Sequence, residues 1–334
     1  MTDAATPLAF PTVDPALAVS LDAGMVAVEA FIAERVDGDD PFIAEGSGHL
    51  YRAGGKRFRP LLTLLAAHLG DGVNERVIAA AAAVELTHLA SLYHDDVMDE
   101  ASLRRGAASA NARYGNSTAI LIGDLLFGTA SSIVADLGAE AVKVQAATFV
   151  RLCAGQIRDA RPRPPGVDPI AYYLAVLQDK TGALIATSAR YGAMFSGCDG
   201  ATVELAHTYG ERIGVAFQLA DDLLDIASSG EQSGKTPGTD LREGVDTLPV
   251  LYVKADPSPE DPRLLELLGS DLRSDPAAHA EALKRLRQHS AMARAAEHTR
   301  DVARQAQRVL EPLGQTPAVR SLSWLAGSVV DRVV

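Results

Sequence analysis

The sequence predicts an all-α protein. Helical patterning of apolar residues begins near Ala16 and persists through most of the 334 residues, with glycine and proline marking the breaks. Aromatic residues make up only 5% of the chain while alanine is abundant, and small side chains allow helices to pack closely. Strand signals are missing from the sequence, which has no alternating apolar and polar run and no dipeptide typical of a hairpin turn.

The predicted helices follow one another along the chain. Asn74 is a suitable N-cap for a helix that runs to about Asp99. Asp168 and Pro169 supply the N-cap and the first residue of another helix, which runs to about Ser196. Further helices are predicted at residues 60–69, 117–137, 139–160, 202–227, 277–288, 290–311 and 317–332.

We expect one domain after a short disordered segment. Residues 1–15 contain three prolines and little periodicity, so they are predicted to form a disordered N-terminal lead-in. Within residues 16–334, linker-like composition is confined to 162–168, 229–240 and 255–262, which are ordinary loop lengths. With 47% hydrophobic residues the chain can bury a large core, so a single all-α domain is expected.

Composition argues against several classes of partner. The 31 basic and 43 acidic residues give a net charge of −12, which disfavours nucleic acid or an anionic membrane as the main partner. Cys153 and Cys198 are too few for a disulfide framework and match no zinc spacing, which favours a reducing cytoplasm. The sequence shows no basic and apolar leader and no unbroken apolar run of roughly 18 residues, so we expect a cytoplasmic protein without a transmembrane segment.

An acidic motif, Asp-Asp-Val-Met-Asp, lies at the end of the helix predicted from Asn74. Asp95, Asp96 and Asp99 are three and four residues apart, so their carboxylates share one helix face and repel by roughly 0.2–0.5 kcal/mol per pair. Hard oxygen ligands that leave room for water and phosphate suit Mg²⁺. The simpler alternative is a solvated acidic helix end.

A second acidic motif repeats this spacing. Asp221, Asp222 and Asp225 follow an apolar helical run, as the first motif does, and Gln218 precedes them by one turn. One such motif would be weak support for a metal site, but two copies at helix ends make a solvated surface an unsatisfactory explanation. The sequence therefore predicts a magnesium site that uses both motifs.

Basic residues flank the first acidic motif on both sides. In Gly54-Gly55-Lys56-Arg57-Phe58-Arg59-Pro60, two glycines allow close approach of a ligand, and a helix N-terminus that attracts anions follows the cations. His88 lies two turns before Asp95, and Arg104-Arg105-Gly106 offers two guanidiniums for two phosphate groups. An ordinary basic loop and a cationic helix cap are the respective alternatives.

With Lys180-Thr181 and Phe217-Gln218, these motifs occur in an order that resembles the trans-polyprenyl diphosphate synthases, from about residue 45 to 255. The resemblance implies an isoprenoid-synthase helical bundle around a central cavity, usually a homodimer, with the two acidic motifs facing each other. It implies Mg²⁺-dependent chain elongation, in which an allylic diphosphate ionises, isopentenyl diphosphate attacks the cation and a proton is lost. The apolar cavity would exclude water from that cation.

The resemblance also implies a role for each motif residue. Asp95, Asp99, Asp221 and Asp225 would bind Mg²⁺, helped by Asp96 and Asp222. Isopentenyl diphosphate would be held by Lys56, Arg59, His88 and Arg105. The allylic diphosphate would be held by Arg104, Lys180, Thr181, Gln218 and Lys235. The catalytic residues would be Asp95, Asp96, Asp99, Arg104, Lys180, Asp221 and Asp222.

Product length is predicted from two small residues. In the family that the chain resembles, the residues four and five positions before the first acidic motif shape the floor of the cavity, and here they are Ser91 and Ala90. They lie about 6–7.5 Å from Asp95 along the helix, so small side chains leave a growing tail room. We expect a long-chain product, such as the precursor of a quinone side chain. The alternatives are a geranylgeranyl- or farnesyl-type short-chain synthase, a terpene cyclase, or a non-catalytic subunit of a synthase.

Overall fold

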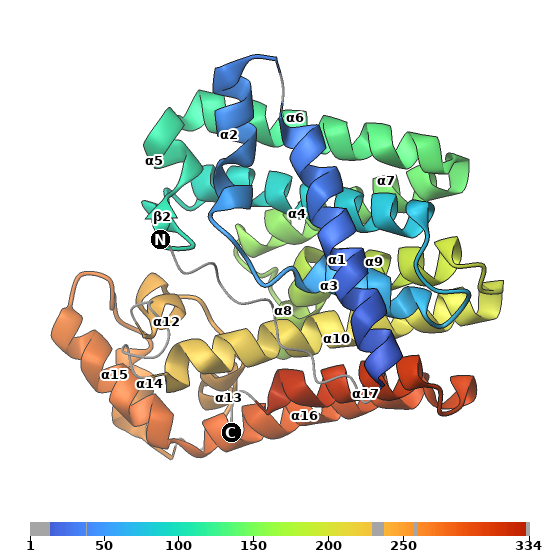
Figure 1. Ribbon diagram of the computed structural model, residues 1–334. Coiled ribbons are helices and arrows are strands. Elements are labelled where there is room, and N and C mark those ends of the chain that lie inside the picture. Colours follow the sequence, from blue (N-terminus) through green and yellow to red (C-terminus); the bar gives the residue numbers. More distant parts are fainter. Residues whose placement is uncertain (1–13, 38, 229–236, 257–259, 332–334) are drawn as a thin grey trace. The chain divides into compact units, whose positions relative to one another are not determined.

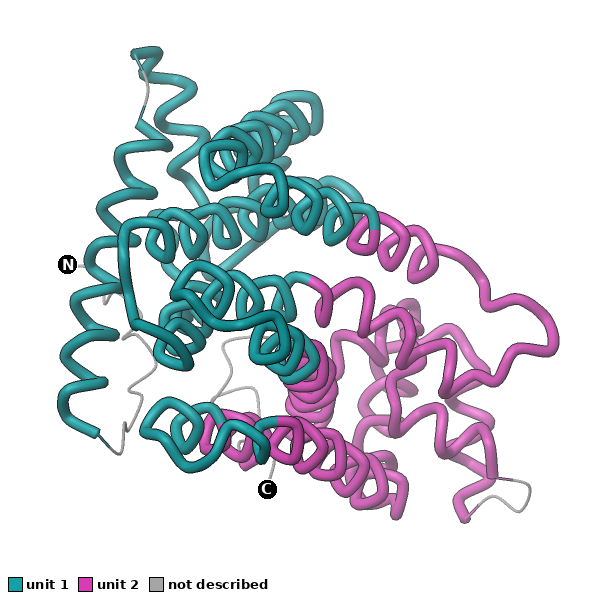
Figure 2. The backbone as a smooth tube through the Cα atoms, turned by 90° about the vertical axis from the view of Figure 1, so that its right-hand side faces the viewer, with its two compact units in different colours: residues 1–150, 184–210, 310–322 teal, residues 151–183, 211–309, 323–334 magenta. Residues whose placement is uncertain are grey.

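The computed structural model describes residues 14–37, 39–228, 237–256 and 260–331. Within these ranges the chain is helical almost throughout, so the predicted all-α class is confirmed (Figure 1). Contacts between Cα atoms divide it into two compact units (Figure 2). Unit 1 comprises residues 1–150, 184–210 and 310–322, and unit 2 comprises residues 151–183, 211–309 and 323–334.

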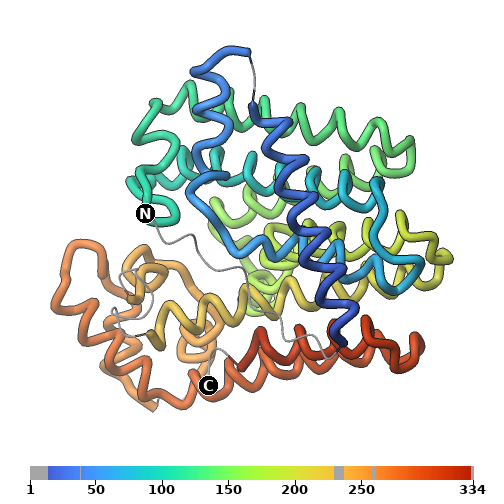
Figure 3. The backbone as a smooth tube through the Cα atoms, viewed as in Figure 1, coloured from blue at the N-terminus to red at the C-terminus, as the bar shows by residue number. Residues whose placement is uncertain are grey.

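The predicted lead-in falls mainly outside the described residues. Asp14 already accepts hydrogen bonds from the amides of Ala16 and Leu17, at 2.9 and 3.0 Å, and thereby caps a helix that begins at Pro15. A single domain over residues 16–334 stays a prediction. Both units are assembled from segments that are far apart in the sequence; Figure 3 colours the backbone by position in the sequence.

Unit 1 draws its helices from three separate parts of the chain. They are α1 (Pro15–Val36), α2 (Pro41–Arg52), α3 (Phe58–Ala67), α4 (Glu75–Met98), α5 (Ala110–Tyr114), α6 (Asn116–Leu137), the first part of α7 (Ala139–Asp159), α9 (Ala183–Phe195), the first part of α10 (Gly200–Ala227), the 3₁₀ turn η2 (Glu311–Leu313) and the first part of α17 (Pro317–Val330). The long helix α4 packs against α1, α3 and α6. The last four alanines of its five-residue alanine run, residues 80–83, are buried, since small side chains bring helices close.

Helix α4 begins where its sequence predicts. The Asn74 side chain accepts hydrogen bonds from the amides of Arg76 and Val77, both at 3.0 Å, and so satisfies two donors of the first turn. The helix ends at Met98, with Asp99 as its C-cap. The acidic motif therefore occupies the last turn of α4, where the helix dipole gives these carboxylates no help.

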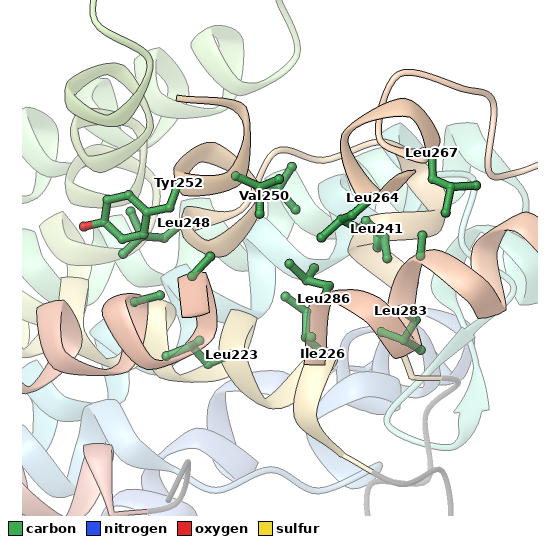
Figure 4. Packing of buried hydrophobic residues seen from close by; sticks show 14 of the residues in the cluster. Leu223, Ile226, Leu241, Leu248, Val250, Tyr252, Leu264, Leu267, Leu283 and Leu286 are labelled. Carbon is green, nitrogen blue, oxygen red and sulfur yellow. The ribbon is translucent and has the colours of Figure 1, made fainter. Parts of the chain in front are cut away.

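Unit 2 has its own hydrophobic core. Its elements are the end of α7, α8 (Pro169–Leu177), the π-helix η1 (Gln178–Gly182), the end of α10, α12 (Thr239–Glu243), α13 (Leu248–Lys254), α14 (Pro262–Leu267), α15 (Pro276–Gln288), α16 (Ser290–Val309) and the end of α17. Leu223 and Ile226 of α10 pack with side chains of α12 to α15, among them Leu264 and Leu286 (Figure 4). This core adjoins the second acidic motif, because Leu223 and Ile226 follow directly after Asp222 and Asp225 along α10.

Predicted helix boundaries agree with the observed ones to within a few residues, and one prediction is wrong. A two-residue hairpin, β1 (Leu103–Arg104) and β2 (Ala107–Ala108), follows α4, although the sequence shows no hairpin signal. Its turn residues Arg105 and Gly106 both have positive φ, 55° and 77°, as a two-residue hairpin turn requires. Arginine is unusual at such a position. Its conformation is fixed instead by tertiary hydrogen bonds, which local sequence does not reveal.

Three helices, α1, α4 and α6, are long and apolar enough to cross a membrane, judged by length and composition alone. The expected absence of a transmembrane segment is therefore not confirmed and stays a prediction. In α4 most of the apolar window is buried within the protein. The apolar face of α6 is more exposed, with Leu121 66% and Leu125 44% accessible.

Candidate active site

The middle aspartate of the first motif is buried and fully engaged. The Arg104 Nε–H donates to Asp96 Oδ1 at 2.6 Å, and the amide of Ala110 at the start of α5 donates to Asp96 Oδ2 at 3.0 Å. Asp96 has no exposed surface. It therefore ties the hairpin and α5 to the end of α4, and Arg104 supplies the cation that its burial requires.

The outer aspartates of this motif are more accessible. Asp95 is partly buried, whereas the Asp99 side chain is 57% exposed and lies 3.9 Å from Arg104 Nη2. Two accessible carboxylates one turn apart suit Mg²⁺, which binds to one or two carboxylates and keeps places for water and phosphate. The donor set at the end of α4 thus fits a magnesium ion.

The glycine-rich loop before α3 packs against Arg105. Gly54 and Gly55 have φ values of 90° and 151°, and a Cβ on Gly55 would lie 2.9 Å from the Arg105 guanidinium carbon. Arg105 donates hydrogen bonds to the carbonyl oxygens of Gly54 and Leu50, the latter at 3.0 Å. The two glycines were predicted to allow a ligand to approach the loop. In the structure they allow the Arg105 guanidinium, itself a predicted ligand-binding group, to approach it. The loop and the hairpin turn are thereby joined.

Arg57 has a structural role that the sequence does not reveal. Its Nε–H donates to Glu29 at 2.5 Å, its Nη1 donates to Glu85 at 3.3 Å, and its guanidinium carbon lies 4.7 Å from the centroid of the Tyr51 ring. The residue adopts a left-handed conformation with φ 49°. Since such a conformation is strained for a residue other than glycine, two ion pairs and a cation–π contact stabilise this turn.

Three cations of this region form no ion pair with the described residues: Lys56, Arg59 and Arg105. The Nε–H of Arg59 is buried and finds no hydrogen-bond partner among the described residues. A buried donor without a partner is costly, and a phosphate oxygen would satisfy it. Three positive charges that form no ion pair within the described ranges match the charge of a diphosphate.

The pKa values in this cluster, which we call the cationic pocket (Lys56, Arg59, His88 and Arg105), follow from burial. The pKa of Arg59 is lowered to about 10, chiefly by burial; Glu85 opposes this lowering and Arg105 adds to it. Burial, with Arg59 and Arg105 adding to it, holds the pKa of His88 well below its usual range. At neutral pH Arg59 is therefore charged and His88 is neutral, so His88 acts as a neutral hydrogen-bonding group.

The middle aspartate of the second motif is buried as well, but its partners are neutral. Asp222 accepts hydrogen bonds from the Tyr173 hydroxyl and from Gln218 Nε2, the latter at 2.8 Å. Thr181 donates in turn to Gln218 Oε1 at 3.2 Å. Burial raises the pKa of Asp222 to about 6, against the lowering effect of these hydrogen bonds. The chain of bonds joins α8, η1 and α10 within unit 2.

The outer aspartates of the second motif differ from each other. Asp221 is exposed, whereas Asp225 is partly buried and accepts hydrogen bonds from the amides of Thr239 and Asp240, at 3.2 and 3.1 Å. Asp225 thus holds the start of α12 while each oxygen retains a lone pair for a metal. No group of three potential metal ligands is preassembled within the described ranges. This is compatible with Mg²⁺, which needs few protein ligands.

Lys180 and Thr181 lie in a π-helix between α8 and α9. Lys180 forms an ion pair with Asp159 at 2.7 Å. Gly155 of α7 packs so closely against this segment that a Cβ at position 155 would lie 2.6 Å from the backbone nitrogen of Lys180. Single π-helical turns are frequent at functional sites, so this segment is a candidate for substrate contact. Lys235, predicted to contact the same substrate, lies outside the described residues.

A small cavity lies beside α4 within unit 1. Its lining includes Ala83, Val84 and Thr87 of α4, together with Gln145 and Thr148 of α7, and its volume is about 10 Å³. Thr87 lies one turn before Ala90 and Ser91, on the face of α4 that also carries Asp95. The space holds about one water molecule, so an isoprenoid tail that extended along this face would displace the lining side chains.

The described residues thus supply two acidic motifs that could hold a divalent metal and a cationic pocket that could hold a diphosphate. Comparison with known proteins agrees. The family described as "Polyprenyl synthetase" matches residues 40–286. A nonaprenyl diphosphate synthase from Mycobacterium tuberculosis is 46% identical over 320 residues, which cover 96% of this chain and 95% of that one.

Solved structures are similar over nearly the whole chain. A geranylgeranyl pyrophosphate synthase from Corynebacterium glutamicum has a TM-score of 0.86 at 40% identity, with 96% of this chain and 99% of that chain covered. A polyprenyl synthase from Caulobacter crescentus has a TM-score of 0.87 at 33% identity, with 95% and 97% covered. Both were solved with calcium and isoprenyl diphosphate.

These similarities first define the class: the protein is a prenyltransferase with the all-α isoprenoid-synthase fold. The chain belongs to the polyprenyl synthetase family, the trans-polyprenyl diphosphate synthases. The family resemblance identified from the sequence motifs is therefore confirmed. The roles assigned to single residues stay predictions, to which the contacts of Asp96, Asp222 and Arg57 add structural functions.

Proposed function

We propose that this synthase is Mg²⁺-dependent and makes a long-chain product by condensing isopentenyl diphosphate repeatedly with an allylic diphosphate. The observation that carries the substrate assignment is the cationic pocket, where Lys56, Arg59 and Arg105 form no ion pair with the described residues and the Arg59 Nε–H is buried without a partner. A diphosphate supplies both the charge and the acceptor that the pocket needs. A terpene cyclase does not need such a pocket for a second substrate.

The condensation makes defined demands on the chain's residues. The bond between carbon 1 and oxygen of the allylic diphosphate breaks, and its electron pair leaves with pyrophosphate. The double bond of isopentenyl diphosphate supplies the electron pair of the new carbon–carbon bond, and loss of a proton restores a double bond. The product keeps the diphosphate that isopentenyl diphosphate brought. Throughout this step Arg59, His88 and Arg105 would hold that diphosphate in place.

The metal is assigned to the outer aspartates of each motif. Asp95, Asp99, Asp221 and Asp225 would bind Mg²⁺, which when bound neutralises the charge that develops on the departing pyrophosphate. The more exposed positions of Asp99 and Asp221 support this assignment, since open carboxylates leave room for water and phosphate. Lys180, Thr181, Gln218 and Arg104 would contact the allylic diphosphate by hydrogen bonds and charge.

A long product is supported by the small residues on α4. Ala90 and Ser91 place little volume near the acidic motif, and the relative of 46% identity is named for a nonaprenyl product. The geranylgeranyl synthase of 40% identity keeps the short-chain alternative open to test. The side chains lining the cavity at Thr87 would have to give way to the tail, as would Leu86 and Leu89 if the tail met them.

Product chromatography tests this proposal. The purified chain alone, with Mg²⁺, isopentenyl diphosphate and a farnesyl starter, is expected to yield dephosphorylated products longer than twenty carbons. Ala90→Phe should shorten them because an added ring fills the path of the tail. Wild-type products of twenty carbons or fewer would refute the long-chain assignment. Failure to consume isopentenyl diphosphate would instead favour a cyclase or a non-catalytic subunit.

We propose further that the chain is a cytoplasmic homodimer. The exposed apolar side chains Leu121 and Leu125 on α6 and Val142 and Val150 on α7 support this, since a second copy would cover them. Light scattering after size-exclusion chromatography is expected to give twice the mass of 35.1 kDa. Leu121→Glu should shift the protein toward the monomer, and recovery of wild-type protein only with detergent would contradict the cytoplasmic assignment.

A further inference from the structure

Glu85 is a buried acidic residue that the proposed mechanism does not use. It lies on α4 one turn before His88, and only 2% of its surface is exposed. Its Oε1 is 3.3 Å from Arg57 Nη1, but Arg57 already has Glu29 at 2.5 Å. Burying a carboxylate costs free energy. Arg57 lies farther from Glu85 than from Glu29, so this ion pair alone does not explain why Glu85 is buried here.

The charge of Glu85 reaches beyond Arg57. The Arg57 Nη1 that lies 3.3 Å from Glu85 also lies 3.5 Å from the Gly54 carbonyl oxygen, to which Arg105 donates a hydrogen bond. Burial lowers the pKa of Arg59 and of Arg105, and the Glu85 carboxylate opposes this lowering at both guanidiniums, whereas Glu29 acts on Arg57. A carboxylate next to the cationic pocket repels an incoming diphosphate. The pocket therefore binds diphosphate less tightly than its own cations would allow.

Repeated elongation gives such a weakening a purpose. After each condensation the elongated chain carries the diphosphate that entered as isopentenyl diphosphate, so it still occupies the cationic pocket. The next isopentenyl diphosphate binds only after that diphosphate has left. A pocket that held diphosphate very tightly would slow every cycle after the first, since release would limit the rate.

We propose that Glu85 is a positioning residue that tempers the hold of Arg59 and Arg105 on diphosphate, so that the elongated product leaves the pocket between condensations. This inference rests on the proposed function, because it takes the cationic pocket as the site of isopentenyl diphosphate. Glu85 would then influence the number of condensations through release of diphosphate, independently of the space available to the isoprenoid tail.

Glu85→Gln tests the inference with a matched control. The amide keeps the shape and can accept a hydrogen bond from Arg57, which retains Glu29, so the fold is expected to survive. Glu29→Gln removes a carboxylate from the same arginine without changing the charge felt by Arg59 and Arg105. A merely structural role of Glu85 in holding Arg57 predicts the same result for both variants.

Calorimetric titration of each full-length protein with isopentenyl diphosphate, in the presence of Mg²⁺, gives the first result. We expect about tenfold tighter binding for Glu85→Gln and binding within twofold of wild type for Glu29→Gln, since one nearby charge is removed from the pocket only in the former. Single-turnover condensation should stay near wild type in Glu85→Gln while KM for isopentenyl diphosphate and kcat both fall and products shorten.

Unchanged or weaker binding in a folded Glu85→Gln protein overturns the inference. If that variant does not fold, Glu85→Asp replaces it. Because the charge is retained, the inference predicts near-wild-type affinity for isopentenyl diphosphate. Loss of binding would show that the length of the side chain matters rather than its charge, and would overturn the inference. The proposed function is tested separately by the wild-type protein. If wild type neither binds nor consumes isopentenyl diphosphate, the substrate assignment itself fails, whatever Glu85 does.

Discussion

The two acidic motifs have the same spacing but different surroundings. In each, the middle aspartate is buried and the outer ones are more accessible, so the repeated pattern produces one structural and two candidate metal-binding carboxylates. In unit 1 the buried Asp96 pairs with the Arg104 cation, whereas in unit 2 the hydrogen-bond partners of the buried Asp222 among the described residues are the neutral side chains of Tyr173 and Gln218.

This difference has an electrostatic consequence. A cation offsets the burial of Asp96, whereas Asp222 forms no ion pair within the described ranges, and burial raises its pKa to about 6. The Asp222 carboxyl is therefore expected to take up a proton when the pH falls to about 6. Identical spacing does not make the two motifs equivalent.

The largest expected effect comes from the outer aspartates, where the motifs should behave alike. Asp95→Ala or Asp221→Ala should lower turnover by at least about 100-fold, because each removes a carboxylate proposed for Mg²⁺. Removing a charge also relieves repulsion in the metal-free protein, so the melting temperature should not fall. Near-normal turnover of either variant at ordinary Mg²⁺ would show that its motif is not used for metal binding.

The cationic pocket and the π-helix should separate the two substrates. Arg105→Gln or Lys56→Gln is expected to weaken isopentenyl diphosphate binding about tenfold or more, since charge-assisted hydrogen bonds to phosphate are local. Lys180→Gln should chiefly weaken the allylic substrate. Kinetic titration of both substrates measures this, and equal losses for both in every variant would contradict the division of roles.

A smaller effect distinguishes the buried aspartates from each other. Asp96→Asn removes the buried negative charge beside Arg104 and leaves one acceptor oxygen for the two donors, Arg104 and the Ala110 amide. It should cost about 2 kcal/mol of unfolding free energy. Asp222→Asn keeps bonding groups for Tyr173 and Gln218 and removes an unfavourable charge. At pH 7, without metal, it should be as stable as wild type or more stable by on the order of 1 kcal/mol. Urea unfolding of both variants in the presence of a chelator measures the difference. Equal losses of unfolding free energy in the two variants would contradict this prediction.

The smallest effect is a pH dependence carried by Asp222. Its carboxyl has a higher pKa in the folded protein, about 6, than the ordinary 3.8. Between these values the folded state binds more protons, so its contribution to stability should fall as pH rises from about 4 to 6 and stay low above that. Asp222→Asn should flatten this part of the profile in chelator. An unchanged profile would mean that burial does not perturb this carboxyl.

The sequence by itself determined the helices, the acidic and basic motifs and, through their order, the family. These features depend on spacing along one helix or on side chains close in sequence, such as Asn74 capping α4. The tertiary structure, in contrast, determines which side chains surround each motif residue. Tyr173 reaches Asp222 from 49 residues away, and Arg57 pairs with Glu29 and Glu85 across 28 residues in each direction.

Only those distant partners decided which carboxylate of each motif is buried, which arginine is structural and which cations remain for a ligand. They also decided the hairpin at Arg105, because its left-handed turn depends on hydrogen bonds to the carbonyls of Leu50 and Gly54. Periodicity fixes the face of a helix on which a side chain lies, since the helix repeat is local. It does not fix what packs against that face, because burial and ion pairing arise from segments that meet only when the chain folds.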